Sequence, residues 1–102
     1  MTKDERYTGV KQLIESGHIT EFKQIFTYLP KTVLAGDLGT NNNRMTRLIN
    51  NVQEFTLEEL DRISQLIDVS YDSINLLVNN QFKKKQASKK GIISIPNKTF
   101  SQ

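Results

Sequence analysis

Twenty residues in the middle of the chain, KTVLAGDLGTNNNRMTRLIN at positions 31–50, place the strongest constraint on its fold. They predict two short helices with a turn at Gly39, because glycine adopts positive φ after a helix without steric cost. Ala35 is small enough for the second helix to cross closely over the first. We expect Thr40 to cap the second helix by accepting hydrogen bonds from its free N–H groups. The wedge between the two helices is predicted to contain the larger apolar residues of this stretch: Leu34, Leu38, Met45 and Leu48.

Two helices are predicted before this central stretch. Residues 5–16 repeat apolar residues at helical spacing, and Gly17 follows them as a stop signal. A second helix is expected from Thr20, its N-cap, to Leu29, with apolar residues at i, i+3, i+4 and i+7. This apolar stripe is the clearest core signal in the N-terminal half.

Two more helices are predicted after the central stretch. Thr56 and Glu59 have the spacing of a capping box, in which each side chain bonds the backbone N–H of the other residue. The apolar face of the helix that follows is expected to contain Leu57, Leu60, Ile63 and Ile67. Ser70 opens a last helix, and no segment alternates as a strand does. The sequence therefore predicts an all-α bundle of five or six short helices.

The net charge of +3 is unevenly distributed. Residues 1–82 contain eight Lys or Arg and eleven Asp or Glu, whereas residues 83–102 contain six lysines and no acidic residue. We therefore expect a helical domain at residues 1–81 and a lysine-rich, largely irregular C-terminal tail at residues 82–102. The short apolar run at residues 91–96 is either an arm that docks on this or a neighbouring chain, or an untidy terminus.

Several kinds of chemistry lack their usual residues. The chain has no cysteine, which excludes disulfides, thiolate metal sites and a cysteine nucleophile. No apolar run approaches the roughly 20 residues of a membrane span, and the N-terminus does not resemble a signal peptide, so we expect a cytoplasmic protein. No glycine-rich phosphate loop, metal-binding spacing or nucleophile–base pair is present. We expect no enzyme activity and assign no catalytic residue, metal, cofactor or small-molecule ligand.

The central stretch and its flanking helices resemble the Cro and lambda-repressor-like family of helix-turn-helix DNA-binding proteins (the xenobiotic-response-element type). The resemblance covers roughly residues 20–80 and rests on Leu34-Ala35, Leu38-Gly39, Met45 and Leu48. It implies that the second helix, at about residues 41–50, lies in the major groove of double-stranded DNA. It also implies a transcriptional regulator that binds DNA as a homodimer.

Carried over residue by residue, the resemblance implies DNA contacts at eight positions: Lys31, Asn41, Asn42, Asn43, Arg44, Thr46, Arg47 and Asn50. The three asparagines would begin the reading helix, where their amides reach base edges or the nearest phosphates. Arg47 is the first choice for a base or phosphate contact one turn later. Lys31 would hold a phosphate at the start of the first helix. Arg44 would lie toward the flank of the reading helix, and Asn50 would meet the DNA backbone.

The residues leave a second function open. Six acidic residues against one arginine make residues 54–72 acidic, so that face cannot lie along phosphates. The alternative is a helical protein-interaction module, antitoxin-like or an adaptor, that has lost DNA binding.

Overall fold

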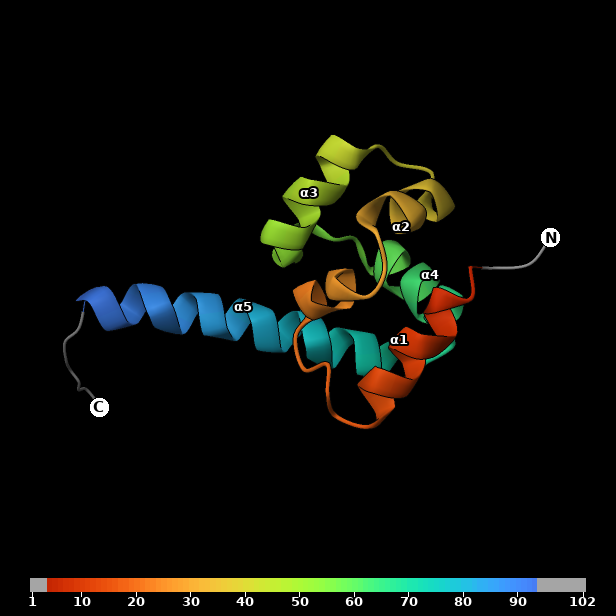
Figure 1. Cartoon of the computed structure of the whole chain (residues 1–102). Helices are drawn as coiled ribbons and strands as arrows, with labels where there is room; N and C mark the ends of the chain where they lie inside the picture. The colour runs from red at the N-terminus through yellow and green to blue at the C-terminus, as the bar shows by residue number, and fades with distance from the viewer. Residues whose placement is uncertain (1–3, 94–102) are drawn as a thin grey trace.

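We describe a computed structural model of the chain, which defines residues 4–93 and the side chains of residues 4–86. Residues 4–93 are all-helical and contain no strand, which confirms the all-α prediction. Five α-helices and two 3₁₀ helices (η) follow one another in this order: α1 (Arg6–Glu15), η1 (Phe22–Thr27), α2 (Lys31–Leu38), α3 (Asn42–Asn50), η2 (Val52–Glu54), α4 (Leu57–Ile67) and α5 (Tyr71–Ile93). The helices pack around one core, with α4 and the first part of α5 beside α1 and with α2 and α3 above them (Figure 1).

Side chains from every helix meet in this core. Phe22 is fully buried, and its ring packs edge-on against the rings of Phe55, at a centroid distance of 5.1 Å, and Phe26, at 5.5 Å. Such edge-to-face pairs stabilise a core beyond the apolar area that they bury. The residues expected to fill the wedge between the two central helices, Leu34, Leu38, Met45 and Leu48, are all buried, and so is the small Ala35 at the expected crossing.

The prediction for Leu57 was wrong. This side chain is 71% exposed, whereas Leu60, Ile63 and Ile67 on the same helix are buried. Side chains of an α-helix tilt toward its N-terminus. Leu57 is the first residue of α4, so its side chain points past the end of the helix and away from the core.

The turn between α2 and α3 begins as predicted at Gly39, which has φ of 74° and ψ of 30° in the left-handed region. The predicted cap one residue later was wrong. Asn41, not Thr40, is the N-cap of α3, and its side-chain oxygen accepts a hydrogen bond of 2.8 Å from the backbone N–H of Arg44. Asparagine and threonine are both good caps, so the sequence signal did not distinguish the two positions.

Between α1 and α2 the structure also differs from the prediction. An α-helix was expected from Thr20 to Leu29, but residues 22–27 form the 3₁₀ helix η1 with Glu21 as its N-cap. The Oε1 atom of Gln24 accepts hydrogen bonds from the backbone N–H groups of Thr20 and Glu21, at 2.7 and 3.0 Å. In a 3₁₀ helix residues i and i+3 lie on one face. Phe22 and Ile25 are therefore buried together, much as they would be in an α-helix.

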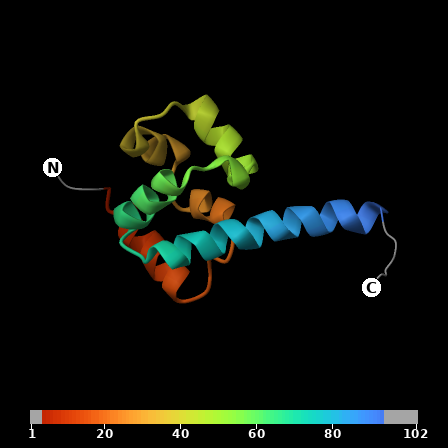
Figure 2. The ribbon, with the colours of Figure 1, turned by 180° about the vertical axis from the view of Figure 1, so that it is seen from behind.

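The largest difference concerns the C-terminal segment. Residues 82–93, which we expected to be irregular, continue α5 without a break, and the predicted arm at residues 91–96 lies only partly within the described residues. The far end of α5 projects from the bundle beneath α3, as Figures 1 and 2 show from opposite sides. The structure extends 54 Å along its longest axis and 30 and 23 Å across it, and the projecting end of α5 lengthens it in one direction.

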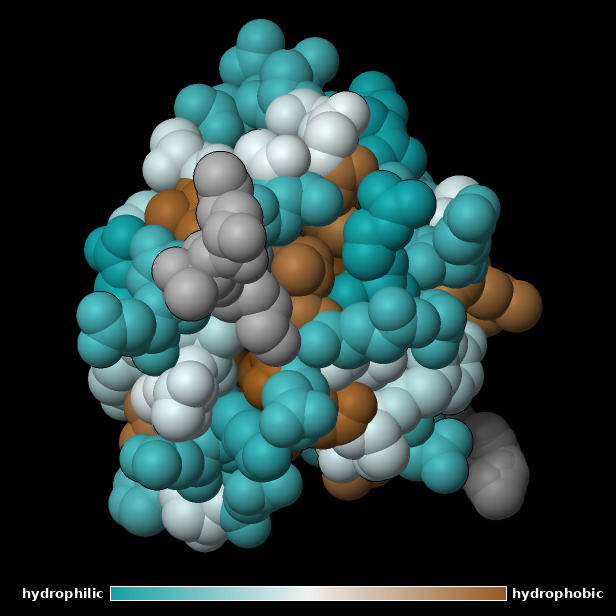
Figure 3. Space-filling view, turned by 90° about the vertical axis from the view of Figure 1, so that its right-hand side faces the viewer, coloured by the Kyte–Doolittle hydropathy of each residue, from teal (hydrophilic) through white to brown (hydrophobic). Residues whose placement is uncertain are grey.

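The opposite end of the molecule carries α1 and α4 and is mainly hydrophilic (Figure 3). Hydrophobic side chains show there as separate small areas between polar and charged ones.

Candidate nucleic-acid interface

The candidate interface is the outer face of α3. The helix turns Met45 and Leu48 into the core, and these two residues fix which side of the helix faces outward. Six of the predicted contact residues lie on α3, of which four are exposed and two, Arg44 and Thr46, are half-buried. The exposed four are Asn42, Asn43, Arg47 and Asn50. The side chains of α3 on this face are amide, hydroxyl and guanidinium groups, and the carboxylates beside them come from the later residues Glu54 and Glu59.

The two remaining predicted residues stand at the edge of this face. Asn41 is exposed, but its side-chain oxygen is occupied by the cap of α3. Lys31, at the start of α2, donates through Nζ to the Oγ1 atom of Thr46 at 2.6 Å. This hydrogen bond places a positive charge beside the middle of α3.

The two arginines of α3 have different surroundings. The Nη1 atom of Arg44 lies 2.5 Å from Oε2 of Glu59, and both side chains are mostly covered. This contact raises the pKa of Arg44, and the hydrogen bond from Arg44 lowers the pKa of Glu59. The Nε atom of Arg47 lies 3.3 Å from Oε1 of Glu54, and the Arg47 side chain is 62% exposed. Exposed ion pairs contribute roughly 0–1 kcal/mol to stability, so Arg47 can leave Glu54 at little cost in free energy. Arg44, in contrast, is held to α4 by its mostly covered ion pair with Glu59.

Sequence reasoning missed the part that α5 plays at the C-terminal end of α3. The Nζ atom of Lys85 donates to the backbone oxygen of Asn50 and to Oδ1 of Asn51, both at 3.1 Å. Gln81, only 9% exposed, donates to the backbone oxygen of Ile49 at 2.7 Å. The signal was the high helix propensity of the Lys, Gln and Ala residues between positions 83 and 90. A segment of that composition can continue a helix as readily as it can form a solvated tail.

The side chains of residues 4–86 contain no group of three or more His, Asp or Glu arranged to hold a metal ion. None of the helices described between residues 4 and 93 combines the length and the apolar character needed to cross a membrane. The outer face of α3 is a polar surface with one ammonium group beside its middle, from Lys31, and another at its C-terminal end, from Lys85.

Comparison of the chain with protein-family models, with curated proteins and with solved structures gives no match.

Proposed function

We propose that this protein binds double-stranded DNA in a sequence-specific manner and regulates transcription. In this proposal α2 and α3 form a helix-turn-helix of the lambda-repressor-like type, and α3 lies in the major groove. The protein would act as a homodimer, because one helix of nine residues reads only a few base pairs.

The proposal rests on the composition of the outer face of α3. Asparagine pairs bidentately with adenine and arginine with guanine, and the exposed side chains of α3 are of these two types. Lys31 on one side and Lys85 at the end of the helix supply positive charge for phosphates that flank a groove. Among the exposed residues of α3, Arg47 combines a free path to solvent with a weakly held partner.

Selection from a pool of random duplexes tests the proposal. We expect the wild-type protein to enrich one sequence motif. Arg47→Ala is expected to bind the selected site about 1–3 kcal/mol more weakly, as for the loss of a bidentate base contact. Arg6→Ala is the matched control, because Arg6 is also an exposed arginine paired with a carboxylate but lies on α1. Failure to enrich any motif, or equal binding by both variants, would contradict base reading by α3.

One observation favours the second candidate, a protein-interaction module. Both arginines of α3 are paired with glutamates from the segment that follows it, which neutralises part of the positive charge on this side. If the chain enriches no DNA sequence and binding persists only as a weak, salt-sensitive effect, the exposed carboxylates of α4 are the surface to search for a basic protein partner. Glu58 and Asp61 are the exposed acidic residues of that helix.

A further inference from the structure

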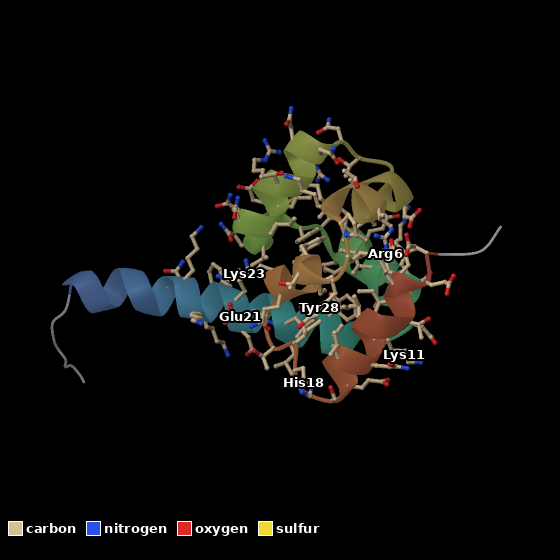
Figure 4. The ribbon with its side chains drawn as sticks, in the orientation of Figure 1. Arg6, Lys11, His18, Glu21, Lys23 and Tyr28 are labelled. Carbon is tan, nitrogen blue, oxygen red and sulfur yellow. The ribbon has the colours of Figure 1, made fainter. Side chains whose placement is uncertain are left out.

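A charged hollow lies where η1, the end of α3 and α5 meet. Its volume is about 240 Å³, below the roughly 300–1,000 Å³ of sites for larger organic ligands. Six residues line it: Glu21, Lys23, Asn50, Gln81, Lys84 and Lys85. Figure 4 shows two of them, Glu21 and Lys23, at the start of η1 and beside α5. Three ammonium groups against one carboxylate leave an excess of two positive charges, which favours a small anion.

The carboxylate in the hollow has one oxygen in use and one without a donor. Glu21 is only 7% exposed, and its Oε2 atom accepts a hydrogen bond of 3.1 Å from Nζ of Lys84. Its Oε1 atom is buried and has no hydrogen-bond partner among the described residues. The Nζ atom of Lys23 is 4.0 Å from Oε1, which is too far for a hydrogen bond. Buried acceptors are almost always paired, so Oε1 lacks a donor that a ligand can supply.

A ligand can reach Oε1 because the group beside it is free to move. The side chain of Lys23 is 59% exposed and does not hydrogen-bond to Glu21, so it can rotate toward solvent. The ligand would then lie between the carboxylate and the ammonium groups. It must be negatively charged for the lysines and must carry a proton for Oε1.

We infer that this hollow binds a phosphate group that retains a proton, either free hydrogen phosphate or a phosphate monoester. The phosphate oxygens accept from the ammonium groups of Lys23, Lys84 and Lys85, and the phosphate O–H donates to Oε1 of Glu21. The phosphodiester of DNA has no such proton, and sulfate has none at neutral pH. The site shares Asn50 and Lys85 with the proposed DNA face, but its preference for a protonated phosphate comes from Glu21 and does not depend on the proposed function.

NMR titration of the full-length protein at pH 6 and constant ionic strength tests the inference, because about half of a phosphate monoester still carries its proton at that pH. The probes are inorganic phosphate, glycerol 3-phosphate, dimethyl phosphate and sulfate. We expect phosphate or glycerol 3-phosphate to bind at least about tenfold more tightly than sulfate and dimethyl phosphate, because a buried acceptor rejects ligands that cannot donate to it. A preference of well over twofold for free phosphate, or any preference for glycerol 3-phosphate, identifies which of the two is the ligand, since the difference in protonated fraction alone accounts for about twofold. Equal affinity for phosphate and sulfate would overturn the inference.

Two substitutions separate the acceptor from the positive charge. Glu21→Gln, which replaces the carboxylate by an amide able to donate, is expected to reduce the preference for phosphate over sulfate to less than about twofold. Lys23→Gln is expected to weaken the binding of phosphate and of sulfate by the same factor. Lys11→Gln, on α1, is expected to leave the affinity for both anions unchanged. A Glu21→Gln variant that folds, as shown by its thermal unfolding without ligand, and keeps the full preference would also overturn the inference.

Discussion

Glu59 joins the start of α4 to the first turn of α3 by dividing its carboxylate between two donors. Its Oε2 atom lies 2.5 Å from Nη1 of Arg44, and its Oε1 atom accepts from the backbone N–H of Thr56 at 3.0 Å. Thr56 completes the capping box by accepting from the backbone N–H of Glu59 at 3.1 Å. One side chain therefore both caps α4 and fixes the position of the helix that we propose reads DNA.

Replacing Glu59 separates these two roles. Glu59→Gln keeps a side-chain oxygen for the cap but removes the ion pair, and we expect it to lower the free energy of unfolding by about 1 kcal/mol or less. Glu59→Ala loses both interactions and should cost about 1–2 kcal/mol. Urea denaturation at pH 7 measures both values. Equal losses in the two variants would show that the cap contributes nothing.

The same carboxylate predicts sensitivity to acid. The hydrogen bond from Arg44 lowers the pKa of Glu59 in the folded protein below its ordinary value of 4.5. A lowered folded pKa means that the contribution to stability is fully present above pH 4.5 and is lost as the pH falls through the folded value. We expect stability to decline below about pH 4.5 and the decline to be smaller in Glu59→Gln. Unfolding curves measured from pH 7 to pH 3 test this, and identical acid profiles would contradict it.

Two glycines near the turn are expected to respond to alanine in opposite directions. A Cβ atom would meet nothing within 4 Å at either Gly36 or Gly39, so only the backbone conformation distinguishes them. Gly39 has φ of 74°, and alanine there should destabilise the protein by about 1–2 kcal/mol. Gly36 lies inside α2, where alanine should stabilise it by up to about 1 kcal/mol. Thermal unfolding of the two variants measures both changes in stability. A loss of stability for Gly36→Ala would contradict this account.

The side-chain amide of Gln81 makes a testable connection between three helices. It accepts from the backbone N–H of Lys23 at 2.8 Å and donates to the backbone oxygen of Ile49 at 2.7 Å. Gln81→Leu leaves both backbone groups without a partner, which should cost about 1–3 kcal/mol in urea denaturation. Asn79→Ala is the control, because the exposed Asn79 bonds only within α5. Similar losses in both variants would show that the connection contributes nothing.

The hydroxyl of Tyr7 predicts sensitivity to base. It donates to Oδ2 of Asp37 at 2.6 Å, and burial, followed by this hydrogen bond, raises the pKa of Tyr7 well above 10.0. A raised folded pKa means that the stabilisation is present below pH 10 and declines as the pH rises above it. Tyr7→Phe should lose about 1–2 kcal/mol at pH 7 and show a weaker decline above pH 10. Tyr28→Phe, at an exposed tyrosine, should match the wild type at both pH values.

How far the sequence predicts this structure depends on how local each signal is. The capping box of α4 and the positive φ of Gly39 were predicted correctly, because each depends on residues within one turn of the chain. The exposure of Leu57 was missed, because it depends on where the core ends rather than on helical spacing. On the candidate interface, the outward residues of α3 followed from the two buried ones. The pairs that Arg44 and Arg47 make depend on the packing of later segments, which spacing does not encode.

The uninterrupted α5 also has a mechanical consequence. Twenty-three helical residues form a rod about 34 Å long, with one half seated in the core and the other half outside it. Gln81, near the middle of the rod, is buried and donates to the backbone oxygen of Ile49 at the end of α3. Because the helix is continuous, a force that displaces its far end would also displace the end of α3 that Gln81 holds. A bulky group attached at the far end could therefore shift α3 without contacting it.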